Sequence, residues 1–86
     1  MRVLIDNPVS LGKLARAVRK AQGLRQDDLA AMVGVSHVSL MNVERGKGTV
    51  QLGSVLDVLR ELGIALHLEV PDEAAARVQL ALQEEG

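Results

Sequence analysis

Eighty-six residues are enough for one small domain, and such a chain buries only about 60 to 65% of its unfolded surface, so we expect it to need a partner surface. The absence of Cys excludes disulfides and thiolate zinc sites, and the absence of aromatic residues counts against modules that stack single-stranded bases on aromatic rings. The net charge is −1, but the charges are unevenly distributed: residues 1–47 hold eight basic and four acidic side chains, whereas residues 48–86 hold two basic and seven acidic ones. This distribution indicates a basic surface that binds phosphate and an acidic half that makes another contact.

The first nine residues contain a short apolar run from Val3 to Ile5, followed by the turn-prone sequence Asp6-Asn7-Pro8. This pattern predicts a short strand or an arm. The run is too short for a signal peptide, and no segment approaches the roughly 18 apolar residues of a membrane span. We therefore expect a cytoplasmic protein with no membrane partner.

An amphipathic helix is predicted over about residues 11–22. Its apolar residues, Leu11, Leu14, Ala15 and Val18, follow the i, i+3, i+4, i+7 spacing of one helical side. Gly23 supplies a residue that can adopt the left-handed conformation and end the helix.

The next two predicted helices, about 26–33 and 37–45, have the spacing of a helix-turn-helix. Two short helices that cross steeply need a small residue at their contact, here Ala30, and a turn residue that tolerates positive φ, here Gly34. Ser36 is a good N-cap for the second helix, because its hydroxyl can accept a hydrogen bond from a backbone N–H two or three residues later.

A fourth helix is predicted over about 52–62, and Gly63 follows its end. Residues 65–70 then alternate between two faces, which predicts a strand that pairs with the N-terminal run or with a second copy of itself. Residues 73–85 have the length of about three helical turns, and a lone helix of that length is marginal in water. We expect this tail to be disordered or held by a partner.

Three segments, Leu24–Ala30, Gly34–Ser36 and Val43–Lys47, resemble the Xre/Cro-type repressor family, and the whole chain is similar to HipB-type antitoxins. The resemblance implies a mostly α fold. It consists of a lambda-repressor-like four-helix helix-turn-helix domain with an N-terminal arm (residues 1–63), then a dimerisation strand and C-terminal tail (64–86). In HipB-like proteins such a strand pairs across a homodimer, and here it would use Leu66, His67, Leu68 and Val70.

The family places its base contacts at the N-terminal end of the second helix of the motif, where a major groove would meet side chains with hydrogen-bonding or apolar tips. Here these are Ser36, His37, Val38, Met41 and Asn42. The expected phosphate contacts are Arg25, Gln26, Ser39, Arg45, Lys47 and Thr49. The resemblance also implies a structural ion pair between Arg19 and Glu44.

We therefore expect a sequence-specific repressor that binds double-stranded DNA at a palindromic operator as a homodimer. By resemblance to HipB it would also neutralise a HipA-like kinase toxin and regulate its own operon. Two alternatives are a free-standing Xre-family repressor without a toxin and an interaction scaffold that has lost DNA binding. No motif supports an enzyme, a metal site or a cofactor: His67, for example, has no other ligand nearby at a suitable spacing.

Overall fold

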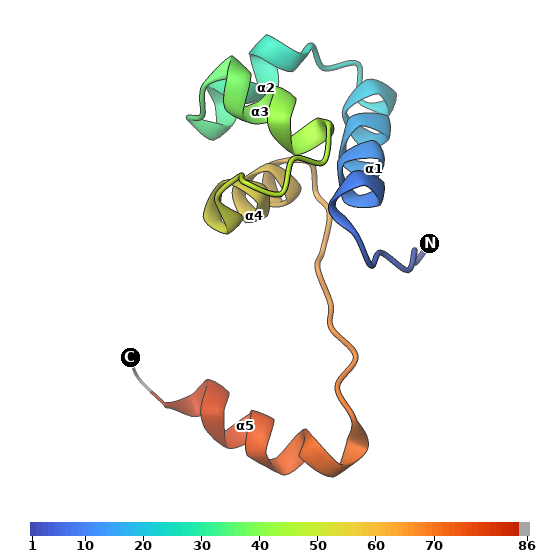
Figure 1. The fold of residues 1–86 in the computed structure, drawn as a ribbon, viewed down its shortest axis with the longest axis vertical. Helices are drawn as coiled ribbons and strands as arrows, with labels where there is room; N and C mark the ends of the chain where they lie inside the picture. Colours follow the sequence, from blue (N-terminus) through green and yellow to red (C-terminus); the bar gives the residue numbers. More distant parts are fainter. Residues whose placement is uncertain (85–86) are drawn as a thin grey trace.

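The computed structural model describes residues 1–84 and shows a body of four helices with a further helix set apart from it (Figure 1). In chain order the elements are α1 (Pro8–Ala21), α2 (Gln26–Val33), α3 (His37–Glu44), α4 (Leu52–Glu61), the 3-10 turn η1 (Asp72–Ala74) and α5 (Ala75–Gln83). None of the helices in this part of the chain has the length and apolar character needed to cross a membrane.

One apolar core holds the four-helix body together. α1 and α2 both pack against α3, and α2 also packs against α4. Burying one Leu or Val side chain contributes about 1.5 to 3 kcal/mol, so a small number of such residues dominates the stability of a body this size. The buried apolar residues are Ala15, Leu29, Ala30, Leu40, Val43, Val55, Val58, Leu59 and Leu62.

α1 begins at Pro8, three residues before the start that the apolar spacing predicts. Asn7 is the N-cap, and its side-chain oxygen accepts a hydrogen bond from the backbone N–H of Ser10 at 2.8 Å. Pro8 fits the first helical turn because a backbone N–H there would have no partner within the helix. The sequence Asp6-Asn7-Pro8 therefore starts the helix, and residues 1–6 before it form neither a helix nor a strand.

The helix-turn-helix forms as its turn and cap residues predict. Gly34 ends α2 in the left-handed conformation with φ of 84°, and its N–H donates to the carbonyl of Ala30 at 2.9 Å. Ser36 then caps α3, since its hydroxyl oxygen accepts from the backbone N–H of Ser39 at 3.0 Å. The four predicted helices of the body are thus present, and α2 has the predicted bounds.

Two glycines allow α1 to approach the end of α3 closely. A Cβ atom on Gly12 would lie 2.5 Å from the carbonyl oxygen of Glu44 and 2.6 Å from that of Val43. A Cβ atom on Gly46, whose φ is 73°, would lie 2.5 Å from Cα of Val9. The crossing of α1 and α3 therefore depends on the missing side chains at both positions.

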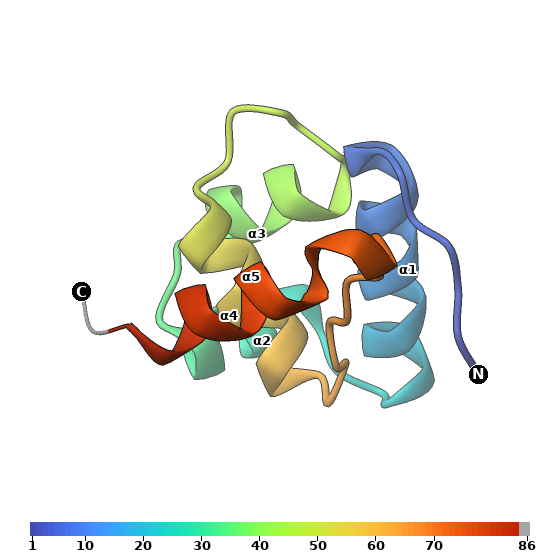
Figure 2. The same ribbon diagram turned by 90° about the horizontal axis from the view of Figure 1, so that it is seen from below.

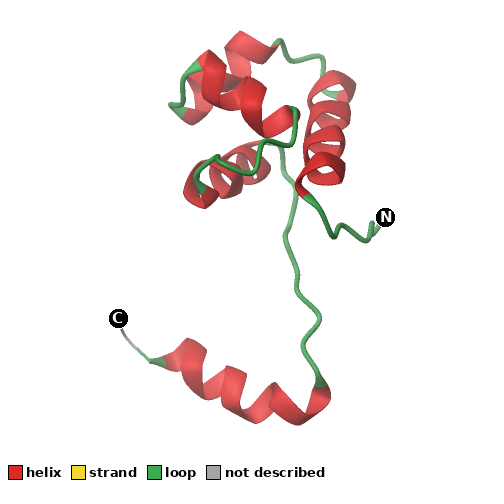
Figure 3. Ribbon diagram, viewed as in Figure 1, coloured by secondary structure: helices red, strands yellow, loops and turns green. Residues whose placement is uncertain are grey.

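The prediction of a C-terminal β-strand pairing across a homodimer is wrong. Residues 65–70 are extended but form no β-ladder, and no strand is present anywhere in residues 1–84 (Figure 3). The alternating pattern indicates which side chains share a face, whereas a strand also needs a neighbour that exchanges backbone hydrogen bonds. The N-terminal run provides no such neighbour, and Leu66, His67, Leu68 and Val70 are all exposed.

The C-terminal tail forms η1 and α5, which an extended segment joins to the body (Figure 1). Figure 2, seen from below, shows α5 overlapping the body in projection. α5 packs against η1. Only Ala74 and Val78 are half-buried in this region, whereas Leu80 and Leu82 are 62% and 81% exposed. The tail therefore presents apolar side chains that no other part of residues 1–84 covers.

Candidate nucleic-acid interface

α3 exposes the side chains at its N-terminal end. His37 and Val38 are exposed, and the residue exposure of Val38 is 59%, which is high for an apolar side chain. Met41 and Asn42 follow one turn later and are half-buried. Together with the capping residue Ser36, these side chains lie at one end of a helix whose opposite side is in the core.

The side-chain amide of Gln26, at the start of α2, connects α3 to the centre of the body. Its Nε2 donates to Oε1 of Glu44 at 3.1 Å, and its Oε1 lies 2.7 Å from Nε2 of His37. A carboxylate only accepts hydrogen bonds, so the amide nitrogen faces Glu44 and the amide oxygen faces His37. His37 must then donate through Nε2, and one N–H of Gln26 remains for a ligand.

When the His37 ring is neutral, this hydrogen bond determines which of its nitrogen atoms is free to accept from a ligand. In the neutral imidazole one ring nitrogen donates and the other accepts, so a donating Nε2 leaves Nδ1 as the acceptor. In the major groove, the exocyclic amines of adenine and cytosine are the donors that such an acceptor matches. The contact to Gln26 thus gives His37 a defined hydrogen-bonding character.

Glu44 is buried but well supplied with donors. Arg19 donates through Nε to Oε2 at 2.7 Å and through Nη2 to Oε1 at 3.1 Å, and its Nη1 donates to the carbonyl of Leu24 at 2.8 Å. The Nε of Arg16 lies 4.0 Å from Oε1. The Arg19–Glu44 ion pair therefore joins α1 to the end of α3 and also holds the carboxylate that orients Gln26.

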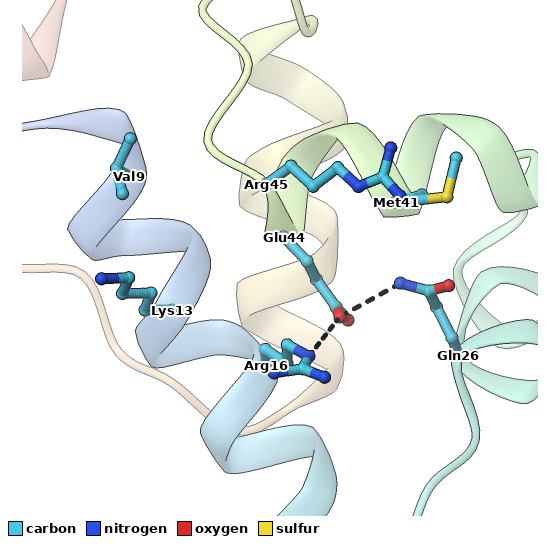
Figure 4. Close-up of a pocket in the computed structure, with 7 residues that line it drawn as sticks. All are labelled: Val9, Lys13, Arg16, Gln26, Met41, Glu44 and Arg45. Atoms are coloured by element: carbon cyan, nitrogen blue, oxygen red, sulfur yellow. Dashed lines mark hydrogen bonds and ion pairs between the residues drawn. The ribbon is translucent and has the colours of Figure 1, made fainter.

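A hollow of about 480 Å³ lies between α1 and α3, beside the start of α2 (Figure 4). It brings together one predicted base contact, Met41, and two predicted phosphate contacts, Gln26 and Arg45. It also contains two cations that the sequence-based prediction missed, Lys13 and Arg16. We call this the α1–α3 hollow, and it is lined by Val9, Lys13, Arg16, Gln26, Met41, Glu44 and Arg45.

The positions of Lys13 and Arg16 on α1 could have been predicted from their spacing in the sequence. They lie three residues apart, and Arg16 lies three residues before Arg19, so all three cations fall along neighbouring parts of α1. The partner of Arg19 was predicted on α3. The same side of α1 could therefore have been assigned to the nucleic-acid surface.

A second hollow, of about 310 Å³, lies between α3 and the start of α4. Three predicted contacts, Ser39, Asn42 and Thr49, line it. Gln51 and Ser54 also line it and were not predicted. Gln51 precedes α4 without making a side-chain cap, so the first N–H groups of that helix keep their donor capacity. This hollow is polar and carries no charged side chain.

The last two predicted phosphate contacts lie outside both hollows. Arg25 is exposed and forms an ion pair with Asp27 at 3.2 Å. Lys47 is exposed in the connection between α3 and α4, where its backbone N–H donates to the carbonyl of Asn42 at 3.0 Å. Both side chains are on the surface near the ends of the helix-turn-helix.

Comparison with known proteins identifies the class of this domain. Residues 16–68 match the family model HTH_3, described as Helix-turn-helix. The chain belongs to this family. This helix-turn-helix protein is 45% identical over 69 residues to the HTH-type transcriptional regulator y4mF of Sinorhizobium fredii (strain NBRC 101917 / NGR234), an alignment that covers 80% of this chain and 91% of y4mF.

Solved structures show the same fold. The HipB chains of a HipA-HipB-O2-O3 complex and of a HipB-O4 20mer complex match with TM-scores of 0.74 and 0.73, each at 22% identity and over 83% of this chain and the whole of that chain. The restriction-modification controller protein C.AhdI from Aeromonas hydrophila matches with a TM-score of 0.60 at 35% identity, over 66% of this chain and 86% of that chain. The predicted Xre-type family is therefore confirmed, and the protein is a helix-turn-helix DNA-binding transcriptional regulator.

The chemistry of the helix-turn-helix surface suits an anionic duplex. Both hollows beside α3 present donors or cations, and the exposed end of α3 presents hydrogen-bonding and apolar groups. Within residues 1–84, no three His, Cys, Asp or Glu residues are grouped so that they could hold a metal ion.

Proposed function

We propose that this regulator is a sequence-specific repressor that inserts α3 into the major groove of a palindromic operator. The observation that supports this best is that α3 exposes its N-terminal end and is bordered further along by two hollows lined with groups that can bind phosphate. Ser36, His37, Val38, Met41 and Asn42 would contact base edges, whereas phosphate contacts fix position and carry no sequence information directly.

A palindromic operator requires two copies of α3, and we propose that the repressor is a homodimer. One α3 covers a single half-site, and half-sites of helix-turn-helix dimers lie about 34 Å apart, one turn of the duplex. The exposed apolar side chains after α4, such as Leu66, Leu68 and Val70, offer surface for a second copy. An interface between two identical chains would be self-complementary.

We further propose that the protein is the antitoxin of a HipBA-like system, that it neutralises a HipA-like kinase and that it represses its own operon. The match to the full length of HipB chains supports this, since one of those chains was solved together with HipA. The C-terminal region is acidic and exposed, so DNA would repel it, and it can serve as a surface for a protein partner.

A free-standing regulator without a toxin is the second candidate. Its support is sequence identity, which is 45% with y4mF and 35% with C.AhdI but only 22% with HipB. An interaction scaffold without DNA binding is the third candidate, and it does not explain why hydrogen-bond donors are exposed around α3.

Two experiments separate these candidates. A gel shift with the DNA upstream of the protein's own gene distinguishes both repressors from the scaffold, because the scaffold would shift neither this DNA nor random DNA. Co-purification with the product of a neighbouring kinase gene, followed by a kinase assay with and without the protein, distinguishes the antitoxin from the free-standing regulator. A kinase that neither binds nor loses activity would contradict the antitoxin proposal.

The proposed contact residues have different signatures in binding assays. Arg45→Ala or Lys47→Ala should weaken binding to all sequences about equally and reduce the salt dependence. Asn42→Ala should relax base preference and cost about 1 to 3 kcal/mol on the operator alone. Equal losses on operator and random DNA for Asn42→Ala would contradict its assignment to base contact.

A further inference from the structure

We propose that the α1–α3 hollow binds a backbone phosphodiester of the DNA through Lys13 and Arg16, so that the DNA surface includes α1. This inference rests on the proposed DNA binding and adds a site to it. Neither residue is in the helix-turn-helix, and neither was among the predicted contacts.

Helical spacing places the lining residues in two rows that face each other. On α1, Val9, Lys13 and Arg16 occupy positions i, i+4 and i+7, which lie on one helical side. Met41 and Arg45 are four residues apart at the end of α3 and form the opposite wall. Figure 4 shows side chains from both helices bordering the same space.

The hollow is electropositive because its single carboxylate is already neutralised. The side chain of Glu44 is 3% exposed and forms the ion pair with Arg19, which lies outside the lining. Within residues 1–84, Lys13 and Arg45 have no carboxylate within 4.0 Å. Three cations therefore act on an anion that enters, and the apolar walls formed by Val9 and Met41 strengthen their field.

Continuity with the recognition surface identifies the anion as DNA phosphate. Gln26 and Arg45 line this hollow and also belong to the proposed phosphate contacts, and Met41 belongs to the proposed base contacts. Lys13 and Arg16 line the same hollow as Gln26 and Arg45, so a phosphate held by the latter two side chains would also lie near the former two.

The test is the salt dependence of DNA binding, measured by fluorescence anisotropy with the full chain. The probes are a 30-base-pair duplex of random sequence and the duplex upstream of the protein's own gene. The variants are Lys13→Gln, Arg16→Gln and the double variant. Arg77→Gln is the matched control, because it removes the same charge from α5, outside the four-helix body. Circular dichroism confirms that each variant is folded, which is expected because both side chains are exposed.

Each variant should reduce the slope of log affinity against log salt by about 0.9 per bound protomer, and the double variant by about 1.8. Between 50 and 200 mM salt, the affinity of the wild type should therefore fall about 3.5-fold more than the affinity of a variant that lacks one contact. Slopes of Lys13→Gln and Arg16→Gln equal to that of Arg77→Gln, with wild-type binding intact, would overturn the α1 site alone. A wild-type protein that binds neither duplex would overturn the proposed function together with this site.

Discussion

Replacing Arg19 by Met removes the partner of a buried carboxylate. Arg19 donates two hydrogen bonds to Glu44 and one to the carbonyl of Leu24. After the substitution, Glu44 keeps only the amide of Gln26 and the distant guanidinium of Arg16, whose side chain is 56% exposed. The side chain of Glu44 is only 3% exposed, so water that enters the α1–α3 hollow has little access to replace the lost donors.

The expected loss is a large part of the stability of this domain. Removing one partner of a buried ion pair costs about 3 to 5 kcal/mol, because the other charge remains buried. A chain of 86 residues has a total stability of about 4 to 13 kcal/mol, at about 0.05 to 0.15 kcal/mol per residue. For a domain this small, a loss of 3 kcal/mol lowers Tm by about 12 °C or more.

Urea-induced unfolding followed by far-ultraviolet circular dichroism, at one fixed protein concentration, measures this loss. Arg16→Met is the matched control, since it makes the same change on the same helix at an exposed residue, and it should cost less than about 1 kcal/mol. The double variant Arg19→Met/Glu44→Leu should recover most of the stability, because apolar side chains of similar volume replace a buried pair well. A loss below about 1 kcal/mol for Arg19→Met, or a double variant as unstable as the single one, would refute the reasoning.

Further predictions concern packing, capping and base reading. Gly12→Ala should destabilise the fold, because its Cβ would lie 2.5 Å from a backbone oxygen. Gly53→Ala should instead stabilise the fold by about 0.5 to 1 kcal/mol, because Ala favours a helix more than Gly does and nothing lies within 4 Å of the added Cβ. Thermal unfolding of both variants measures the two effects. Ser36→Ala removes the cap of α3 and should cost about 1 kcal/mol in urea unfolding, and an unchanged midpoint would show that the cap contributes nothing. His37→Ala should relax the base preference at one operator position by about 1 to 3 kcal/mol, as measured by binding to a set of single-base variants, and an unchanged preference would argue against base contact by this residue.

The helix-turn-helix was predictable because its signals are local. A left-handed Gly34, a capping Ser36 and the spacing of the core residues each depend on a few neighbours in the sequence. The start of α1 was misplaced because Asn7 before Pro8 is typical of turns as well as of helix starts. The strand over residues 65–70 was wrongly predicted because alternation does not specify a pairing partner.

The candidate site was only partly predictable for a physical reason. Residues on α3 follow from the motif, whereas the α1–α3 hollow depends on how α1 packs against α3, where Gly12 and Gly46 allow a close approach. No periodic pattern shows such a crossing. Lys13 and Arg16 could therefore be recognised as neighbours on α1 but not as neighbours of Arg45.

The hydrogen bonds of Gln26 also have an entropic consequence. Immobilising a flexible side chain when a complex forms costs about 0.5 to 1.5 kcal/mol. Gln26 and His37 are already held in the free protein by each other and by Glu44, so most of this ordering takes place during folding and not on the DNA. Substitutions that loosen the buried ion pair should therefore slow or weaken operator binding even where the fold survives.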